Sequence, residues 1–403
     1  MIIHNTNKFK TIRVSIYFKE EIKKENIGLR AILPNLMISS TPTYKTRKAL
    51  TLALENLYGA TIDAKTTKQG KLSVMEFSLE FINPAFTTLA TFNEALTLLH
   101  EIIYGHPNLP KKEFEIEKRL LIEKIKAYEN DKTTFALGRM FEEMFKEERY
   151  GLRVNGKIED VEPLTYQNVN SYYKKSIASN DCDVLLSGDL SPEIIKLVEN
   201  HFKGRSNKQL NSIDFETKLV ETVKNISEYD KISQTKLNIG YRFPVLFSDQ
   251  DYYTAVLFNT TLGGAVHSRL FTNVREKHSL CYYIASRYDA NKGISYIYSG
   301  VDKDRVDLAL KVINEQIADL KENIVTEEEL NLSKKSIINR LKELEDNQRF
   351  AVNNLYQQVL SDEIISLEER ILLINQVKPE EVLKVAKKLE EDTVYLLWPE
   401  EKQ

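Results

Sequence analysis

The order of apolar and polar positions predicts the same succession of elements twice along the chain. Alternating stretches at Ile12–Phe18 and Leu237–Phe243 are typical of β-strands. Each is followed by a predicted helix that ends at a glycine, Leu52–Gly59 in the first copy and Tyr252–Gly263 in the second. The shared order indicates an internal repeat.

Each predicted helix leads into two further alternating stretches joined by a turn, then into helices, and then into a short late strand. The paired stretches are Ala60–Thr67 with Leu72–Phe81, joined around Gly70, and Leu280–Arg287 with Ile294–Gly300, joined around Asn291–Gly293; the late strands are Asp183–Ser187 and Thr393–Leu397. We therefore expect an α+β fold with two homologous halves. Each half should be a mostly antiparallel sheet with helices packed on one face.

Two charged amphipathic helices support this repeat residue by residue. Phe114–Glu129 and Leu330–Glu345 align at a constant offset, and the apolar positions of both copies recur at helical spacing. The polar stretch between the halves lacks a sustained apolar face and is typical of a linker. The predicted domains are an N-terminal half at 1–203, a linker at 204–234 and a C-terminal half at 235–403.

Composition narrows the class of protein without naming a function. A chain of 403 residues with 42% hydrophobic and 29% charged residues is globular, and a net charge of −3 gives no general attraction to nucleic acid or anionic membranes. No apolar run approaches the roughly 18 residues that span a bilayer, and the first residues lack the pattern of a signal peptide. The two cysteines, Cys182 and Cys281, exclude a disulfide framework, so we expect a reducing, cytoplasmic setting.

Histidine spacing argues against a zinc site in this chain. The six histidines form neither His-Glu-x-x-His nor His-x-x-Glu-His. A catalytic zinc helix needs two imidazoles four residues apart on one face, with a carboxylate close by. His100 and His106 are six residues apart across Gly105, so they do not share a helix face, and a helix-end and a loop histidine are the simpler interpretation.

The evidence for other kinds of catalytic or binding site is equally weak in the sequence. Cys281 lies near His278, but residues three apart on a strand face opposite sides, so a packed small residue is the simpler interpretation. The segment Gly263–Arg269 has paired glycines but no phosphate-binding lysine. Arg275 and Tyr282 could converge on a peptide carbonyl or carboxylate, although an ordinary surface arginine and core tyrosine fit the residues alone.

The segment Asn259–Tyr283 resembles the C-terminal signature of the pitrilysin, insulinase and mitochondrial processing peptidase family. It contains Leu-Gly-Gly, then Ser-Arg-Leu-Phe, Arg-Glu-Lys and Leu-x-Tyr in that order. In that family the arginine, and the tyrosine seven residues later, help to hold the substrate peptide opposite the zinc ion. The resemblance implies this substrate-binding role for Arg275 and Tyr282, and it extends over essentially the whole chain.

The N-terminal half departs from the family at the zinc site. Where catalytic members carry Gly-x-x-His-x-x-Glu-His, this chain has Ala31, Pro34 and Asn35 after Gly28. The third ligand, a glutamate of a later helix, corresponds to Lys124, with Glu123 adjacent. Alanine has no donor atom and an asparagine amide is a poor zinc ligand, so the resemblance implies that this chain binds no metal and has no catalytic residues.

The resemblance implies a non-catalytic, substrate-binding subunit of a heterodimeric zinc endopeptidase. Its partner would be a homologous, zinc-bearing subunit, and the substrates would be unfolded peptides or leader peptides. Such pairs occur in mitochondria and in bacteria, and a bacterial cytoplasmic subunit is the form that this sequence resembles most. One alternative is a non-enzymatic peptide-binding or scaffold protein of the same fold, and another is an independent enzyme with different chemistry.

Overall fold

The computed structural model of the chain describes residues 1–205, 210–214 and 220–400. These residues divide into two compact units. Unit 1 contains Met1–Ala127, Leu152–Ser212 and Leu344–Leu360, and unit 2 contains Tyr128–Gly151, Ile213–Glu343 and Ser361–Gln403. Each unit therefore includes one short segment whose neighbours in sequence belong to the other unit.

Each unit is built on a five-stranded sheet, and the two sheets have the same strand order. The order is β1-β5-β2-β4-β3 in unit 1 and β6-β10-β7-β9-β8 in unit 2. The strands are β1 (Ile2–Asn5), β2 (Thr11–Glu21), β3 (Thr61–Gln69), β4 (Leu72–Ile82), β5 (Asp181–Gly188), β6 (Lys224–Asp230), β7 (Thr235–Arg242), β8 (Cys281–Asp289), β9 (Ile294–Val301) and β10 (Glu390–Pro399). One edge pair in each sheet is parallel and the remaining pairs are antiparallel. The predicted α+β class and the repeat are confirmed.

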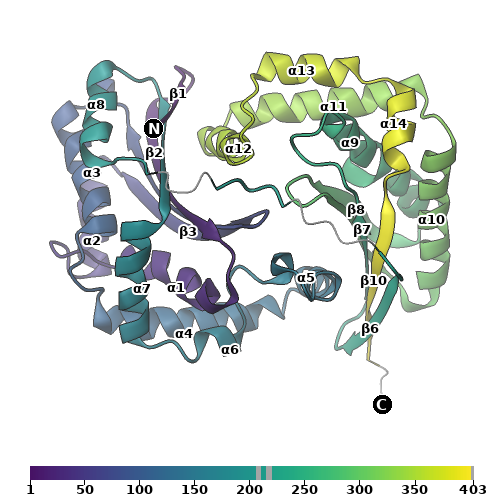
Figure 1. Ribbon diagram of the computed structural model, residues 1–403, viewed down its shortest axis with the longest axis horizontal. Coiled ribbons are helices and arrows are strands. Elements are labelled where there is room, and N and C mark those ends of the chain that lie inside the picture. Colours follow the sequence, from purple (N-terminus) through teal and green to yellow (C-terminus); the bar gives the residue numbers. More distant parts are fainter. Residues whose placement is uncertain (206–209, 215–219, 401–403) are drawn as a thin grey trace. The chain divides into compact units, whose positions relative to one another are not determined.

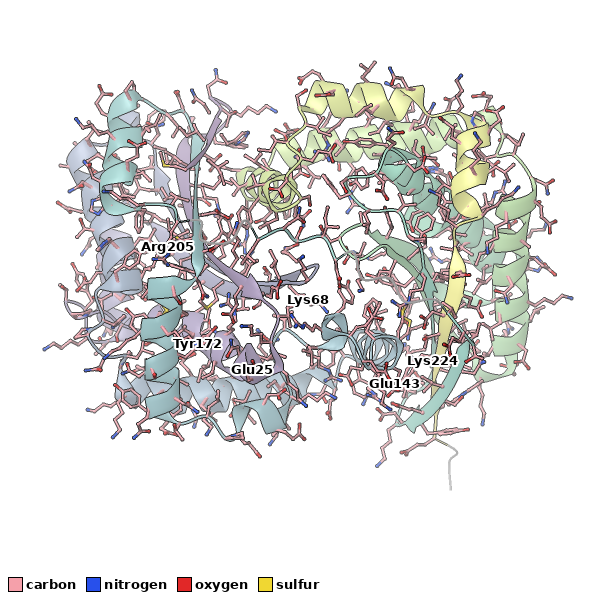
Figure 2. All side chains as sticks on the ribbon, viewed as in Figure 1. Glu25, Lys68, Glu143, Tyr172, Arg205 and Lys224 are labelled. Atoms are coloured by element: carbon pink, nitrogen blue, oxygen red, sulfur yellow. The ribbon has the colours of Figure 1, made fainter. Side chains whose placement is uncertain are left out.

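Helices cover one face of the unit 1 sheet (Figure 1). They are α1 (Ile27–Met37), α2 (Arg47–Asn56), α3 (Leu89–Tyr104), α4 (Lys111–Tyr128), α6 (Ile158–Val161), α7 (Tyr166–Ser179) and α8 (Pro192–His201). The apolar sides of these helices pack against alternate residues of β2, among them Ile16 and Phe18, and together they form one hydrophobic core. The Arg205 side chain caps the C-terminal end of α7. Its guanidinium donates at 2.6 Å to the carbonyl oxygen of Asn180, which directly follows the last residue of the helix (Figure 2).

A single helix, α12 (Gln348–Leu360), packs on the opposite face of this sheet. The Tyr356 ring stacks on Tyr17 of β2 with 3.5 Å between centroids, and Val352 lies in the same apolar cluster. The buried Gln348 amide accepts a hydrogen bond from the Thr11 hydroxyl at 2.7 Å and donates to the Thr11 carbonyl at 3.1 Å. The sequence predicted helices on one face only, and α12 is an addition to that arrangement.

Unit 2 repeats this plan. Its helices are α9 (Tyr252–Asn259), α10 (Val306–Glu322), α11 (Glu327–Glu345), α13 (Leu367–Gln376) and α14 (Pro379–Ala386), with two π-helical segments, η4 (Thr260–Gly264) and η5 (Leu270–Lys277). The aligned helices of the repeat are α4 and α11, as their matching apolar positions predicted. No helix among the described residues is both long and apolar enough to cross a membrane.

The opposite face of the unit 2 sheet carries α5 (Lys132–Met144). Ala136 and Met140 of α5 form a cluster with Tyr395 and Leu397 of β10. The helix approaches β7 closely because residue 240 is glycine: a Cβ there would lie 2.6 Å from the Met144 sulfur. At the C-terminal end of α5, the Lys224 ammonium donates to the Glu143 carbonyl at 2.8 Å (Figure 2).

The stretch predicted as a linker, 204–234, includes one strand. Within it, β6 pairs in parallel with β10, as β1 does with β5 in unit 1. Residues 206–209 and 215–219 of the stretch lie outside the described residues. The boundaries at 203 and 235 stay a prediction about where the repeat divides. The compact units are divided differently, because the segment that carries α5 belongs to unit 2 and the segment that carries α12 belongs to unit 1.

Candidate functional site

The positions predicted to correspond to zinc ligands lie in unit 1, and the structure gives them different surroundings. Ala31 is 6% exposed and belongs to the apolar core, and Pro34 is buried in the interior of α1. Asn35, on the same helix, is exposed, and so is Lys124 on α4. Within the described ranges, no group of three or more histidine, cysteine, aspartate or glutamate side chains could hold a metal ion.

Pro34 changes the backbone hydrogen bonding of α1. Proline has no N–H group, so it cannot donate to the carbonyl oxygen four residues earlier, which belongs to Arg30. That oxygen instead accepts a hydrogen bond from the Thr66 hydroxyl on β3 at 2.6 Å. A side chain of the edge strand thus replaces the missing helical hydrogen bond, because a buried carbonyl without a partner is costly.

The Arg30 side chain fixes α1 against the sheet. It is 2% exposed, and its guanidinium donates to the Ser73 hydroxyl at 2.8 Å and to the Phe18 carbonyl at 2.8 Å. The Glu20 carboxylate lies 3.6 Å away and also accepts a hydrogen bond from Tyr172 at 2.8 Å. The buried positive charge is therefore paired with a carboxylate and held by several hydrogen bonds, next in sequence to Ala31.

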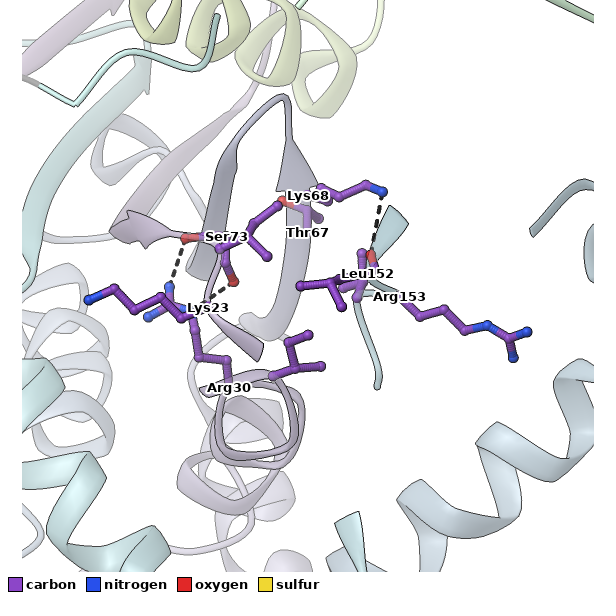
Figure 3. Close-up of a pocket in the computed structure, with 10 residues that line it drawn as sticks. Lys23, Arg30, Thr67, Lys68, Ser73, Leu152 and Arg153 are labelled. Atoms are coloured by element: carbon purple, nitrogen blue, oxygen red, sulfur yellow. Dashed lines mark hydrogen bonds between the residues drawn. The ribbon is translucent and has the colours of Figure 1, made fainter. Parts of the chain in front are cut away.

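Figure 3 shows the pocket beside this arginine, with an empty volume of about 300 Å³. The Lys68 ammonium lies 3.5 Å from the Leu152 carbonyl across it, and Lys23 and Arg153 add two more cationic side chains. Its lining residues are Ile22, Lys23, Ile27, Arg30, Thr67, Lys68, Ser73, Leu152, Arg153 and Val154. None of these supplies a carboxylate, imidazole or thiolate, so the pocket does not fit a zinc ion.

Gly28 has a structural role in the packing of α1. A Cβ at this position would lie 2.2 Å from the Asp160 carbonyl oxygen, so the glycine lets the short helix α6 approach the backbone of α1. The first residue of the family pattern is therefore explained by packing in this chain.

Arg275 lies in unit 2, on the π-helical segment η5 that precedes β8. Its guanidinium stacks over the Phe271 ring, with 4.6 Å from Cζ to the ring centroid, and the residue is exposed. Ion pairs of Arg269 with Asp319 and, at 2.8 Å, with Glu329 fix the start of this segment. Wide π-helical turns are uncommon and are often found at functional sites.

Tyr282 lies where the pairing of β8 with β9 is interrupted. The register shifts between Cys281 and Tyr283, so Tyr282 is the extra residue of a β-bulge. It is 68% exposed, and Ser279 just before the strand has a positive φ of 51°. Bulges at sheet edges often redirect a side chain, and β8 is the last strand of its sheet.

Gly263, the first of the paired glycines in the signature, allows the chain to pack closely against β8. A Cβ on Gly263 would lie 2.7 Å from the backbone nitrogen of Ser286 in β8. The Ser286 hydroxyl donates to the Asn259 carbonyl at 3.1 Å, which joins the end of α9 to β8. Gly263 is therefore needed for close packing rather than for binding a phosphate.

The remaining residues singled out in the sequence are explained by packing. Burial raises the pKa of the Cys281 thiol above its usual range, which disfavours a thiolate nucleophile. The His106 ring contacts the Met37 carbonyl at 3.3 Å, whereas the His100 ring lies 6.0 Å from that of His201. Arg30 and Thr66 were not predicted from the sequence, although Pro34, which has no N–H group, was a signal for both.

The chain resembles known proteins over nearly its full length. Residues 163–337 match the family model for the peptidase M16 inactive domain. The chain is 32% identical over 98% of its length, and 94% of the relative's, to a probable inactive metalloprotease, YmfF, of Bacillus subtilis. It is 22% identical over 96% of its length, and 93% of the relative's, to an uncharacterized zinc protease, YmxG, of the same organism.

Among solved structures, a conserved protein from Enterococcus faecalis superimposes with a TM-score of 0.92 at 26% identity. The match covers 100% of this chain and 96% of that one, so both sheets and their helices are shared. The long match to YmfF, together with the match to the model of the inactive domain, shows that the chain belongs to the peptidase M16 family as an inactive member.

Proposed function

We propose that this chain is the non-catalytic, substrate-binding subunit of a heterodimeric zinc endopeptidase. The partner is a homologous, zinc-bearing subunit, and the zinc ion belongs to that partner. The substrates are unfolded peptides or leader peptides, which have backbone groups available for hydrogen bonding, and the complex works in the cytoplasm.

One contrast within the chain carries this proposal. Helix α1, which the resemblance aligns with the zinc helix of the family, contains Pro34 and is joined to its surroundings through Thr66 and the buried Arg30. By contrast, Arg275 and Tyr282 are exposed on η5 and on the bulge of β8. A guanidinium and a phenol hydroxyl can both donate to the carbonyl oxygen of a peptide.

The relatives support the pairing. Bacillus subtilis has both a probable inactive metalloprotease and an uncharacterized zinc protease that resemble this chain over nearly its full length. Two related chains in one organism, one named a zinc protease and the other an inactive metalloprotease, are what a heterodimer of this kind requires.

The test is peptide cleavage by the two subunits reconstituted from one organism. We expect the lone chain to cleave nothing and the complex to be active. Tyr282→Phe and Arg275→Lys should each lower kcat/KM about a hundredfold, because each removes a donor to an oxygen that becomes more negative in the transition state. Gel filtration should show intact complexes, and Tyr58→Phe, at an exposed tyrosine of unit 1, serves as the control.

Two results would decide against the proposal. Near-normal turnover by both variants in an intact complex would remove the substrate-binding role of Arg275 and Tyr282. A stable complex that cleaves no peptide would favour the alternative of a scaffold protein.

A further inference from the structure

Three tyrosines in unit 2 form a continuous strip across β8 and β9. The strip consists of Tyr283, Tyr298 and Tyr296, with ring centroids 6.2 Å apart in the first pair and 6.3 Å apart in the second. Arg287 pairs with Tyr296 in the register of the two strands, so these side chains share one sheet face. This is the face on which α5 packs, since the Tyr296 ring meets Phe141 of α5 at 5.0 Å.

The strip is only partly covered. The Thr133 hydroxyl of α5 lies 3.1 Å from the Tyr283 hydroxyl, so α5 supports both ends of the strip, and all three rings remain partly exposed. Tyrosine is enriched at protein interfaces because its ring offers rigid apolar area and its hydroxyl a hydrogen bond. A sheet face with three adjoining tyrosines is therefore a surface suited to holding a peptide.

Arg287 gives this surface a charge preference. It is exposed, and its Nε lies 3.5 Å from the Tyr298 hydroxyl oxygen. Among the described residues no carboxylate lies within ion-pair distance of it, in contrast to Arg242 and Arg269 of the same unit, which are both paired with carboxylates. The neighbouring cation Lys236 stands over the Tyr283 ring at 5.4 Å. Burial lowers the pKa of Lys236, and the charge of Asp131, which caps α5, partly opposes this shift.

We propose that Arg287, with the Tyr298 hydroxyl, binds an acidic side chain of the peptide that this subunit holds. A guanidinium fork and a phenol hydroxyl together can donate several hydrogen bonds to one carboxylate. The inference rests on the proposed function and adds a substrate class to it: extended peptides that carry a glutamate or aspartate.

The fold also gives the position of that acidic residue. Tyr282 and Arg287 are 287 − 282 = 5 positions apart along β8. At about 3.3 Å per residue this is roughly 17 Å, which about five residues of an extended peptide would span. The acidic side chain should therefore lie about five residues from the peptide group that Arg275 and Tyr282 contact.

The experiment measures binding of fluorescent synthetic peptides to the full chain by anisotropy. The probes are twelve-residue unstructured peptides of Ala, Ser, Leu and Gln, one without charge and the others with a single Glu at successive positions. We expect one or two Glu positions to tighten Kd about fivefold relative to Gln, as for a solvent-exposed ion pair. Arg287→Gln should remove this preference, Arg287→Lys should retain part of it, and Lys311→Gln, an exposed cation on α10, should leave it unchanged.

The possible results separate this inference from the proposed function. If peptides bind in a manner that depends on Tyr282, but Glu and Gln peptides bind equally, the charge preference is wrong and the proposed function stands. If the preference persists in a folded Arg287→Gln protein, the assignment to Arg287 is overturned. If no peptide binds to the chain or to its reconstituted complex, both fail together; circular dichroism confirms that each variant is folded.

Discussion

At the scale of single residues, the hydrogen bonding of helix α1 is arranged around a proline. Pro34 leaves the Arg30 carbonyl without its helical donor, and Thr66 supplies a hydroxyl at 2.6 Å instead. The Arg30 side chain meanwhile uses its own donors on β2 and β4. The site is therefore a self-sufficient structural cluster, rather than an empty metal site.

This cluster leads to a prediction about Thr66. We expect Thr66→Val to destabilise the protein by about 1–3 kcal/mol, because it keeps the side-chain volume but leaves a buried carbonyl oxygen without a partner. In a Pro34→Ala background the new N–H group can donate to the same oxygen, so the cost of Thr66→Val should shrink. Urea unfolding of the four proteins gives the coupling free energy. Equal costs in both backgrounds would show that the two donors do not serve the same oxygen.

At the scale of elements, the packing of α3 on α8 brings two histidines together. The His100 and His201 rings lie 6.0 Å apart, and His201 contacts the Asn93 side-chain oxygen at 2.9 Å. Burial lowers the pKa of both imidazoles, and the neighbouring His100 lowers that of His201 further. Both rings are therefore harder to protonate in the folded protein than in the unfolded chain.

The sign of this effect predicts loss of stability in mild acid. Above the unfolded pKa of about 6.5 both forms of the chain carry neutral imidazoles, so stability is unaffected. As the pH falls below that value the unfolded chain binds protons that the folded protein resists, and stability is lost until the folded pKa is passed. We expect the Tm to fall from pH 6.5 to 5.5, and to fall less in His100→Gln and His201→Gln.

The comparison with variants isolates these two rings from other titrating groups. His278→Gln, at an exposed position after η5, is the matched control and should keep the slope of the wild type. An unchanged slope in both helix variants would show that the α3–α8 pair does not contribute to the pH dependence.

At the scale of the whole molecule, each unit is completed by a helix from the other half of the sequence. Unit 1 includes Leu344–Leu360 with α12, and unit 2 includes Tyr128–Gly151 with α5. A buried ionic chain holds the latter segment: Arg242 bonds to Asp392 at 2.7 Å and to Glu148 at 2.9 Å, and Lys292 bonds to Glu148 at 2.7 Å. In neither unit are both faces of the sheet covered by helices from the same half of the sequence.

We therefore expect the two halves to depend on each other for folding. A chain cut at a protease site placed within 204–234 should still elute as one folded species, because α5 and α12 stay in the sheets that they complete. Each half produced alone should aggregate, since Tyr17 and Leu185 in one half, or Tyr395 and Leu397 in the other, would lose the helix that covers them. The measurement is gel filtration with circular dichroism, and two folded, separate monomers after the cut would contradict the prediction.

The sequence by itself determined the elements and their repetition. Strand and helix periodicity is a local property, so β2, β4, β7 and β9 appear close to where the alternation predicted them. The correspondence of Ala31, Pro34, Asn35 and Lys124 to zinc-ligand positions comes from the resemblance and stays a prediction. The roles of Arg275 and Tyr282 remain a prediction from resemblance, now with known surroundings.

Only the tertiary structure decided how the polar face of β2 is used. Its alternation suggests a solvated side at Arg13, Ser15 and Lys19, yet these residues are between 0% and 7% exposed. The helix that lies over this face, α12, comes from more than three hundred positions later in the chain. Local periodicity carries no information about such a distant partner, and the same holds for the Thr66 hydroxyl that replaces a hydrogen bond in α1 and for the bulge that exposes Tyr282.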